Sequence, residues 1–219
     1  MCFCHKSTQT MRFSYSPDIS VIMPTFNRAH CLENAVESVI AQSFNNWELL
    51  IVDDGSSDNT VETLSPYIER FPNIRYLRHK NRKAALSRNA GIQASLGTYI
   101  TFLDSDDHYL NYHLESRKTI LEENEDVFLL SGGFLCDDNM WVKDCNNPDQ
   151  LIHIRECILG GTFFGRRELF FALEGFREMD YAEDTDLWER ALKLFSVKKI
   201  DNPKTYVYRR AEDSITLNY

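Results

Sequence analysis

Three acidic side chains stand together directly after an apolar run of the chain. Asp104, Asp106 and Asp107 follow residues 96–103, a segment typical of a β-strand. Like charges this close raise the pKa of one another unless a cation compensates them. Carboxylate oxygens suit Mg²⁺ and Mn²⁺, which also hold substrate phosphates. The pattern therefore predicts a Mn or Mg site at Asp104 and Asp106. The alternative is a solvated acidic turn, or a cap for a helix that begins near Tyr112.

Two further polar clusters follow apolar runs, "PTFNR" after the first run and "DDGSSDNT" after the second. In parallel α/β sheets, ligands bind at the carboxyl ends of strands, so all three clusters are expected at one edge. Asp54 is then placed to bind a base or ribose, and Asn81 and Arg88 to reach the same pocket. The alternative for Asp53 and Asp54 is a turn or N-cap role, which we expect for one of the two.

The phosphate-binding motifs that the chain lacks restrict the choice of ligand. No G-x-x-x-x-G-K-[ST] loop occurs, and no G-x-G-x-x-G follows the first apolar run. A P-loop and a dinucleotide fingerprint are thereby excluded. A nucleoside diphosphate, held by a metal ion and by side chains, fits these clusters better.

Periodicity predicts the elements that would position these side chains. In the first half, strands are expected at 19–24, 47–52, 73–79 and 96–103, and helices at 31–42, 59–71 and 83–95. This fourfold alternation requires crossover connections and a mainly parallel sheet with helices on both faces. In the second half, helices are expected at 113–125 and 183–195 with a short one after Gly165, strands at 126–136 and 204–210, and a polar loop at 136–150.

Length and composition bound the class of protein. The 219 residues, 43% of them hydrophobic, suit one domain at 18–219 after a loose lead-in at 1–17. A net charge of -9 argues against general binding to nucleic acid or anionic membranes. Six cysteines without a C-x-x-C pair indicate reduced thiols. Because no apolar run forms a signal peptide or a membrane span, we expect a cytoplasmic protein.

Four stretches together resemble a known family. "SVIMPTFNR", "WELLIVDDGSSDNT", "RNAGIQASLGTYITFLDSDD" and "YAEDTDLWERAL" are similar to the family 2 inverting glycosyltransferases, in order, from about residue 18 to the C-terminus. The resemblance implies an α/β GT-A fold, with a Rossmann-like, mainly parallel (mixed) central sheet flanked by helices. It also implies a nucleotide-binding half at 18–110 and an acceptor and catalytic half at 111–219.

The resemblance assigns roles to individual residues. Asp184 would be the catalytic general base, with Glu183 as its neighbour, and Asp106, with Asp104, would bind the metal. The donor would be bound by Pro24, Thr25, Asp54, Asn81, Arg88, Asp104, Ser105, Arg210 and Ser214. Two positions depart from the family pattern: Lys83 stands where Gly is common, and Ala211 where His is common. Without the resemblance, the favoured explanation of Glu183 and Asp184 is the ordinary preference of acids for the start of a helix.

The implied reaction transfers a sugar, with inversion, from a nucleoside-diphosphate sugar to an acceptor hydroxyl. Uridine diphosphate is the default nucleotide, with guanosine and thymidine forms as alternatives. The sugar is a hexose or N-acetylhexosamine, and the acceptor is a carbohydrate, glycolipid or peptide. The setting would be polysaccharide or glycoconjugate biosynthesis, with at most peripheral contact at the inner face of a membrane. The alternatives are a sugar-phosphate nucleotidyltransferase, for which "PTFNRAHC" lacks the glycine cluster, and a binding protein without turnover, against which intact Asp104, Asp106 and Asp184 argue.

Other conspicuous residues have simpler explanations. His79, His108, His113 and His153 lack metal-ligand spacing and are expected at the surface or in a satisfied interior position. Trp141 or Trp188 can stack on a sugar ring. Gly160 and Gly161 allow either a close backbone approach that shapes the acceptor cleft or a plain tight turn.

Overall fold

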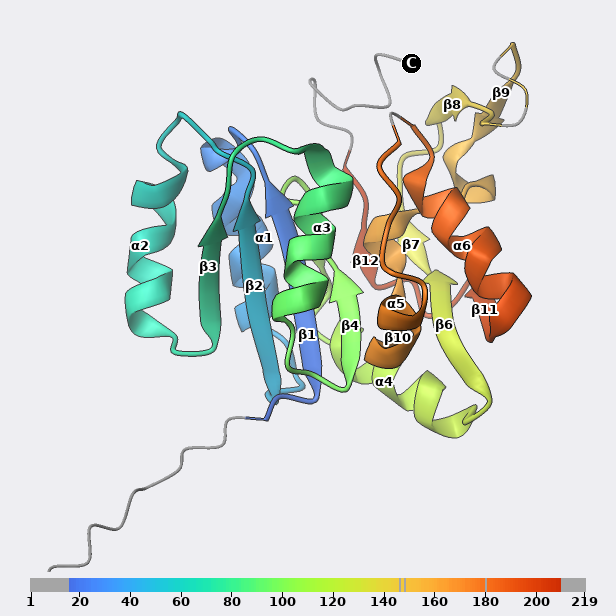
Figure 1. Ribbon diagram of the computed structural model, residues 1–219, viewed down its shortest axis with the longest axis horizontal. Coiled ribbons are helices and arrows are strands. Elements are labelled where there is room, and N and C mark those ends of the chain that lie inside the picture. The colour runs from blue at the N-terminus through green and yellow to red at the C-terminus, as the bar shows by residue number, and fades with distance from the viewer. Residues whose placement is uncertain (1–15, 146, 148, 180, 210–219) are drawn as a thin grey trace, which may run out of the picture.

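The computed structural model describes residues 16–145, 147, 149–179 and 181–209, and its centre is a seven-stranded sheet (Figure 1). The strand order is β11-β6-β10-β4-β1-β2-β3. Neighbouring strands are parallel except at β10, which runs antiparallel to both β4 and β6. The prediction of a mainly parallel, mixed sheet is therefore confirmed. The strands are β1 (Ile19–Thr25), β2 (Trp47–Asp53), β3 (Ile74–Arg78), β4 (Tyr99–Phe102), β6 (Val127–Gly132), β10 (Phe164–Arg166) and β11 (Ser196–Ile200).

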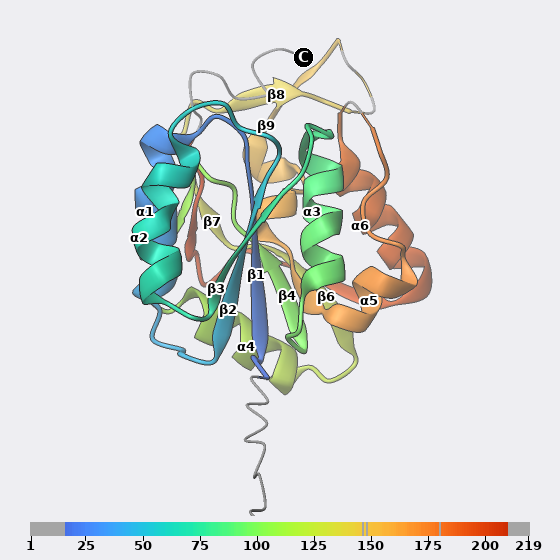
Figure 2. The ribbon, with the colours of Figure 1, turned by 60° about the vertical axis from the view of Figure 1, so that its left-hand side comes forward.

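Helices cover both faces of this sheet (Figures 1 and 2). On β1 and β2 every residue is buried, because alternate side chains point into two different cores. Val21 and Leu49 face the core under α1, α2 and α4, whereas Ile22 and Leu50 face the core under α3, α5 and α6. The helices are α1 (Ala29–Ile40), α2 (Thr60–Arg70), α3 (Lys83–Ala94), α4 (His113–Glu123), α5 (Arg167–Ala172) and α6 (Glu183–Leu194).

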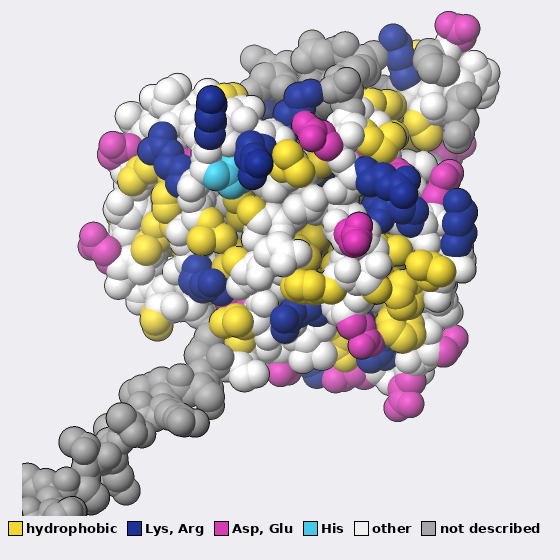
Figure 3. All heavy atoms as spheres, viewed as in Figure 1, with side chains coloured by type: hydrophobic (Ala, Val, Ile, Leu, Met, Phe, Trp, Pro, Cys, Tyr) yellow, Lys and Arg dark blue, Asp and Glu magenta, His cyan; other side chains and the backbone are white. Residues whose placement is uncertain are grey.

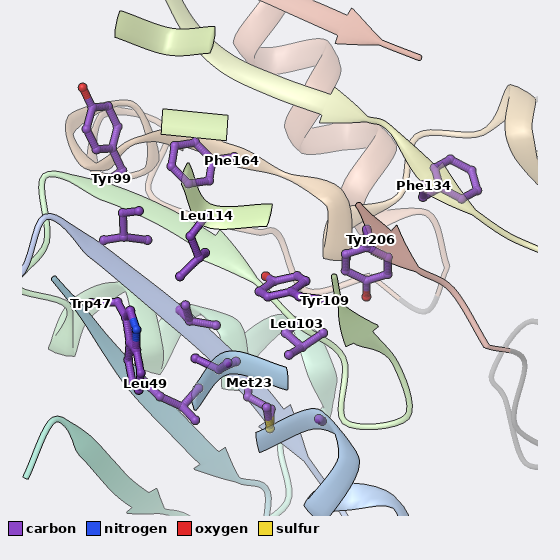
Figure 4. Close-up of a cluster of buried hydrophobic side chains, with 14 of the residues drawn as sticks. Met23, Trp47, Leu49, Tyr99, Leu103, Tyr109, Leu114, Phe134, Phe164 and Tyr206 are labelled. Atoms are coloured by element: carbon purple, nitrogen blue, oxygen red, sulfur yellow. The ribbon is translucent and has the colours of Figure 1, made fainter. Parts of the chain in front are cut away.

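Two small sheets complete the fold. β5 (His108–Tyr109), β12 (Tyr206–Val207) and β7 (Phe134–Leu135) form one of them, and β8 (Trp141–Lys143) pairs with β9 (Leu151–His153) in a hairpin. The 3₁₀ turns η1 (Ile154–Glu156) and η2 (Gly160–Thr162) follow the hairpin. Figure 4 shows Tyr206 of β12 and Tyr109 of β5 in the core that also contains Val21 and Leu49.

The second half differs from the sequence-based expectation in several places. The strand expected at 126–136 is divided into β6 and β7, because Gly133 takes a positive φ of 66° that turns the chain into the other sheet. The loop expected at 136–150 contains β8, whose pairing partner β9 begins just beyond that window. β11 was not expected, because its pattern is polar and half-exposed, as suits an edge strand.

The lead-in predicted at 1–17 falls almost wholly outside the described residues. Acidic and basic side chains are interspersed over the face in Figure 3, with no continuous basic surface on the part drawn in colour. No helix in the described part of the chain is both long enough and apolar enough to cross a bilayer.

Candidate active site

A cleft of about 1090 Å³ opens at the carboxyl ends of β1, β2 and β4. These strands end side by side: Thr25 pairs with Asp53, and the Leu103 amide donates to the Ile22 carbonyl at 3.0 Å. α6 and the β8–β9 hairpin supply the opposite wall. The structure therefore brings together, as lining of one cleft, every predicted site residue that it describes: Pro24, Thr25, Asp54, Asn81, Arg88, Asp104, Ser105, Asp106 and Asp184. Arg210, Ala211 and Ser214 lie outside the described residues.

The acidic run forms a tight turn in which the three carboxylates have different surroundings. The Asp107 amide donates to the Asp104 carbonyl at 3.0 Å. Asp104 accepts from Arg88 at 2.8 Å, and Asp106 lies 3.5 Å from an Arg28 guanidinium nitrogen. Both side chains stay partly exposed to the cleft.

Asp107 also contributes to the cleft lining, but it is almost fully buried. It accepts hydrogen bonds from the Tyr206 hydroxyl and, at 2.6 Å, from the Arg209 amide. Burial raises the pKa of Asp107 well above its usual value, and the charges of Asp104 and Asp106 raise it further. Asp107 thus ties the acidic turn to the segment after β12, which leaves Asp104 and Asp106 as the acids available to a cation.

The donor set at this turn fits Mg²⁺ or Mn²⁺ with substrate bound. Among the described residues no cluster of three or more His, Cys, Asp and Glu side chains could hold a metal alone. Mg²⁺ usually binds to one or two carboxylates and completes its shell with water and substrate phosphates. Asp104 and Asp106 match that requirement, so a metal at this turn needs a phosphate ligand.

Asp53 and Asp54 differ in their surroundings, which separates the turn role from the cleft position that the sequence left open for each. Asp53 is fully buried and takes the turn role, accepting from the Ser56 amide at 2.8 Å and from the Tyr76 hydroxyl. Asp54 lines the cleft, and its two oxygens accept from the amides of Arg82 at 2.7 Å and Lys83 at 2.8 Å. A carboxylate has lone pairs for further bonds, so recognition of a base by Asp54 stays a prediction.

The backbone at Lys83 shows why Gly is common at this position of the family pattern. Its φ of 69° lies in the left-handed region, where glycine is favoured, at the residue that opens α3. The hydrogen bond from its amide to Asp54 holds this conformation. The backbone geometry that suits glycine is therefore kept here with a lysine that lines the cleft.

Asp184 enters the cleft from the start of α6. Ala182, with φ 62°, turns the chain into the helix, and Asp184 accepts from the Gly160 amide at 3.0 Å and the Thr185 amide at 2.7 Å. Burial raises the pKa of Asp184 to about 6, and the neighbouring charge of Glu183 adds to the shift. A carboxylate held in place with a pKa near neutrality has the properties of a general base.

Arg88 links the two halves of the site. This side chain of α3 is buried, and it donates to Asp104 at 2.8 Å and to Glu183 at 2.8 Å. Burial alone would lower the pKa of Arg88, but the two carboxylates raise it, so the guanidinium stays charged. Sequence patterns placed Arg88 in the pocket but gave no sign of its partner Glu183, 95 positions away.

Tyr206 is a site residue that the sequence did not indicate. Its hydroxyl donates to Asp107 and lies 3.4 Å from the Asp104 amide nitrogen. A Cβ at Gly161 would collide with this hydroxyl, while Gly160 packs against Asp184. The glycine pair therefore forms the 3₁₀ turn η2 and also lets the backbone come close to the side chains of Tyr206 and Asp184. The only available signal for Tyr206 was the strand pattern at 204–210.

The two candidate sugar platforms lie in different places. Trp188 lines the cleft and stacks on Phe163, with ring centroids 6.2 Å apart. Trp141 is half-exposed on β8 and meets the ring of His153 edge-on. Of the histidines, His113 is fully buried, with Nδ1 2.8 Å from the Thr205 hydroxyl.

The family model "Glycosyl transferase family 2" matches residues 20–167. The chain belongs to this family. Among curated relatives, the chain is 31% identical over 199 residues to an uncharacterized glycosyltransferase, RP339, of Rickettsia prowazekii, covering 84% of this chain and 61% of the relative. It is 33% identical over 147 residues to the putative teichuronic acid biosynthesis glycosyltransferase TuaG of Bacillus subtilis, covering 66% and 56%. The chain thus spans less than two thirds of either relative.

Solved structures give the same fold for this family 2 chain. TarS 1–349 of S. aureus in complex with UDP-GlcNAc has a TM-score of 0.75 at 19% identity, over 92% of this chain and 61% of that one. The mannosyltransferase PcManGT from Pyrobaculum calidifontis, in complex with GDP-Man and Mn²⁺, has a TM-score of 0.74 at 19% identity, over 92% and 59%. The fold is GT-A, as expected from the sequence.

Proposed function

We propose that this protein transfers a sugar, with inversion, from a nucleoside-diphosphate sugar to an acceptor hydroxyl. One observation carries the proposal: Asp184 lines the same cleft as Asp104 and Asp106, and Arg88 connects the acids of the two walls. Inversion requires the base and the leaving group on opposite sides of the reacting carbon. Asp184 as the base on one wall, with Asp104 and Asp106 as metal ligands on the other, would meet that requirement.

Asp184 would take the proton of the acceptor hydroxyl. With a pKa of about 6 it is ionised at neutral pH. The Gly160 and Thr185 amides orient its carboxylate, so little reorganisation is needed before the proton moves. Positioned general bases typically contribute about 10²–10⁴-fold to the rate.

Asp104 and Asp106 would hold Mn²⁺ or Mg²⁺ together with the donor diphosphate. When bound, such a cation offsets the negative charge that develops on the leaving diphosphate. Arg88 keeps Asp104 in its orientation, and Asp107 fixes the turn from behind. The Mn²⁺ in the PcManGT complex supports this use of a divalent cation in the shared fold.

The remaining cleft residues on the β1, β2 and β4 side would bind the donor. We assign the nucleoside to Pro24, Thr25, Asp54 and Asn81, and the diphosphate side to Ser105 and Arg88, with Arg210 and Ser214 closing over it. UDP is the preferred nucleotide, supported by UDP and UDP-GlcNAc in the TarS complexes, whereas GDP-Man in PcManGT keeps guanosine donors open. Residues 18–110 would thus form the nucleotide-binding half and 111–219 the acceptor half.

The wider setting is proposed from the same relatives. The similarity to TuaG, a putative teichuronic acid biosynthesis glycosyltransferase, supports a role in cell-surface polysaccharide or glycoconjugate assembly, carried out by a hexosyl- or N-acetylhexosaminyl-transferase. We place the protein in the cytoplasm, with at most peripheral contact at the inner face of the membrane. A carbohydrate, glycolipid or peptide can supply the acceptor hydroxyl.

A thermal-shift screen tests the donor and metal assignments together. UDP-GlcNAc, UDP-glucose and GDP-mannose are each added with Mn²⁺ or with EDTA, and release of the nucleoside diphosphate is followed in parallel. We expect one donor to raise the Tm only with Mn²⁺, because the metal is needed to hold its diphosphate. A donor present at 100 times its Kd would stabilise the folded protein by about 2.7 kcal/mol. Asp106→Asn should abolish the Mn²⁺-dependent part. Donor stabilisation that is identical with EDTA would overturn the metal assignment, and stabilisation without nucleotide release would favour a binding protein.

A further inference from the structure

The two walls of the cleft differ in chemistry. The wall from β1, β2, α3 and the acidic turn carries charged side chains, among them Arg28, Lys83 and Asp104. The wall beyond Asp184 is predominantly apolar. We call this surface the apolar wall; it comprises Val142, Ile152, Ile154, Met179, Trp188 and Leu192.

The apolar wall begins at the candidate base. Asp184, Trp188 and Leu192 follow one another at intervals of four residues on α6, so they share one face of the helix. Eight residues of helix place Leu192 ~12 Å further along the helix axis than Asp184. The hairpin β8–β9 contributes Val142 and Ile152 to the same cleft.

Part of the apolar wall is open to solvent. Met179 is 41% exposed and Leu192 is 55% exposed. Figure 3 shows hydrophobic side chains reaching the surface among charged ones on the face that carries α6. Contiguous exposed apolar side chains in a cleft are typical of a ligand-binding surface.

The proposed reaction decides which ligand covers this wall. A hydroxyl that loses its proton to Asp184 must belong to a molecule lying on Asp184's side of the cleft, against Trp188 and Leu192. Lys143, Glu156 and Glu189 also line this side and supply polar partners close to the apolar ones. The surface is thus suited to an amphipathic molecule, with a polar group at the base and an apolar group further out.

We propose that the acceptor is a glycoside with a hydrocarbon aglycone, whose sugar hydroxyl meets Asp184 and whose hydrocarbon chain lies along Trp188 and Leu192. This inference rests on the proposed function and narrows its acceptor class to glycolipid-like molecules. A free oligosaccharide would leave the aliphatic side chains uncovered. Removing such side chains from water is favourable in proportion to the apolar area covered.

Matched pairs of methyl and octyl β-glycosides test the proposal. Glucosides, galactosides and N-acetylglucosaminides are titrated calorimetrically into the protein with UDP and Mn²⁺ present, below the concentration at which octyl glycosides form micelles. Each methylene that is fully buried strengthens binding about fourfold. We therefore expect at least one octyl glycoside to bind tenfold or more tightly than its methyl partner, with a negative heat-capacity change.

Two leucines of α6 give a matched comparison. Leu192→Ser removes an apolar side chain from the cleft, whereas Leu194→Ser removes one that is 69% exposed and outside the cleft lining. Leu192→Ser should reduce the octyl-to-methyl affinity ratio several-fold, and Leu194→Ser should leave it at the wild-type value. The ratio within each variant cancels general effects of the substitution.

The outcomes separate this inference from the proposed function. Three results would overturn the proposal that the acceptor carries a hydrocarbon group. They are equal affinities within every pair, no binding of any glycoside, and an equal loss of the octyl-to-methyl ratio in both serine variants. Donor turnover is measured on the same preparations with and without each glycoside. An octyl preference in a protein that turns over no donor would count against the transferase assignment, and turnover without that preference would count against this inference alone.

Discussion

Replacing the candidate base by its amide, Asp184→Asn, should make the protein more stable and less active at neutral pH. Burial and the charge of Glu183 raise the pKa of Asp184 from 3.8 to about 6. The folded state therefore keeps this proton up to about pH 6, whereas the unfolded chain releases it near pH 3.8. Stability contributed by the protonated carboxyl is lost as pH rises through this window. The amide side chain of the variant carries no charge at any of these pH values and escapes the loss.

The magnitude follows from the two pKa values. Linkage gives a loss of about 2 kcal/mol in the wild type between pH 4.5 and 7.5, as an upper limit for a carboxyl that is only partly buried. The difference in free energy of unfolding, variant minus wild type, should therefore rise by about 1–2 kcal/mol over that range. The amide meets the Gly160 and Thr185 amides with one oxygen only, as a protonated carboxyl does, so that cost largely cancels in the pH comparison.

Urea unfolding at pH 4.5 and 7.5, followed by tryptophan fluorescence, measures the difference in free energy of unfolding. The rate of sugar transfer tests the predicted loss of activity. Transfer by the variant should fall about 10²–10⁴-fold. In the wild type the rate should decline below pH about 6, as the base takes up its proton. A stability difference independent of pH, or transfer at the wild-type rate, would refute the reasoning.

Asp186→Asn is the matched control on the same helix. Asp186 lies outside the cleft lining and forms salt bridges with Arg190 at 2.7 Å and Arg177 at 3.1 Å. Its loss should lower the free energy of unfolding by up to about 1 kcal/mol and spare transfer. A control that stabilised the protein like Asp184→Asn would mean that the effect comes from general charge reduction in an acidic protein.

Two further substitutions test the connections within the site. Arg88→Met should move the acid limb of the pH–rate profile to higher pH, because the charge of Arg88 lowers the pKa of Asp184; an unmoved limb at reduced rate would contradict that coupling. The free energy of unfolding of the same variant should fall by about 1–3 kcal/mol. This is less than the cost of breaking a fully buried ion pair, because Asp104 and Glu183 keep 31% and 22% of their side chains exposed. Gly161→Ala should lower the free energy of unfolding by about 1–3 kcal/mol in urea, because the added methyl group collides with the Tyr206 hydroxyl. Pairing it with Tyr206→Phe should recover part of that loss, and strictly additive effects would show that the collision is absent.

The sequence by itself determined the elements whose signals are local. The continuous apolar runs of β1 and β2, the helical spacing of α1 and the strong helix formers of α3 are written in neighbouring residues, so the four strand–helix units are found where they were expected. The polar clusters after these strands also meet as predicted, because parallel strands end at one edge. The shared edge of Asp54, Asp104 and Asp106 could therefore be predicted from their positions in the chain.

Only the tertiary structure decided the arrangements that depend on distant partners. β10 is inserted between β4 and β6, and Tyr206 contacts Asp107. Asp53 binds Tyr76, whereas Asp54 binds Arg82. All these contacts join residues far apart in the chain. Strand pairing at an edge, burial of a carboxylate and the charges around it are set by what packs there, not by flanking residues. For the same reason the sequence placed Asp184 at a helix start, while its raised pKa and its bond to Gly160 exist only in the folded chain.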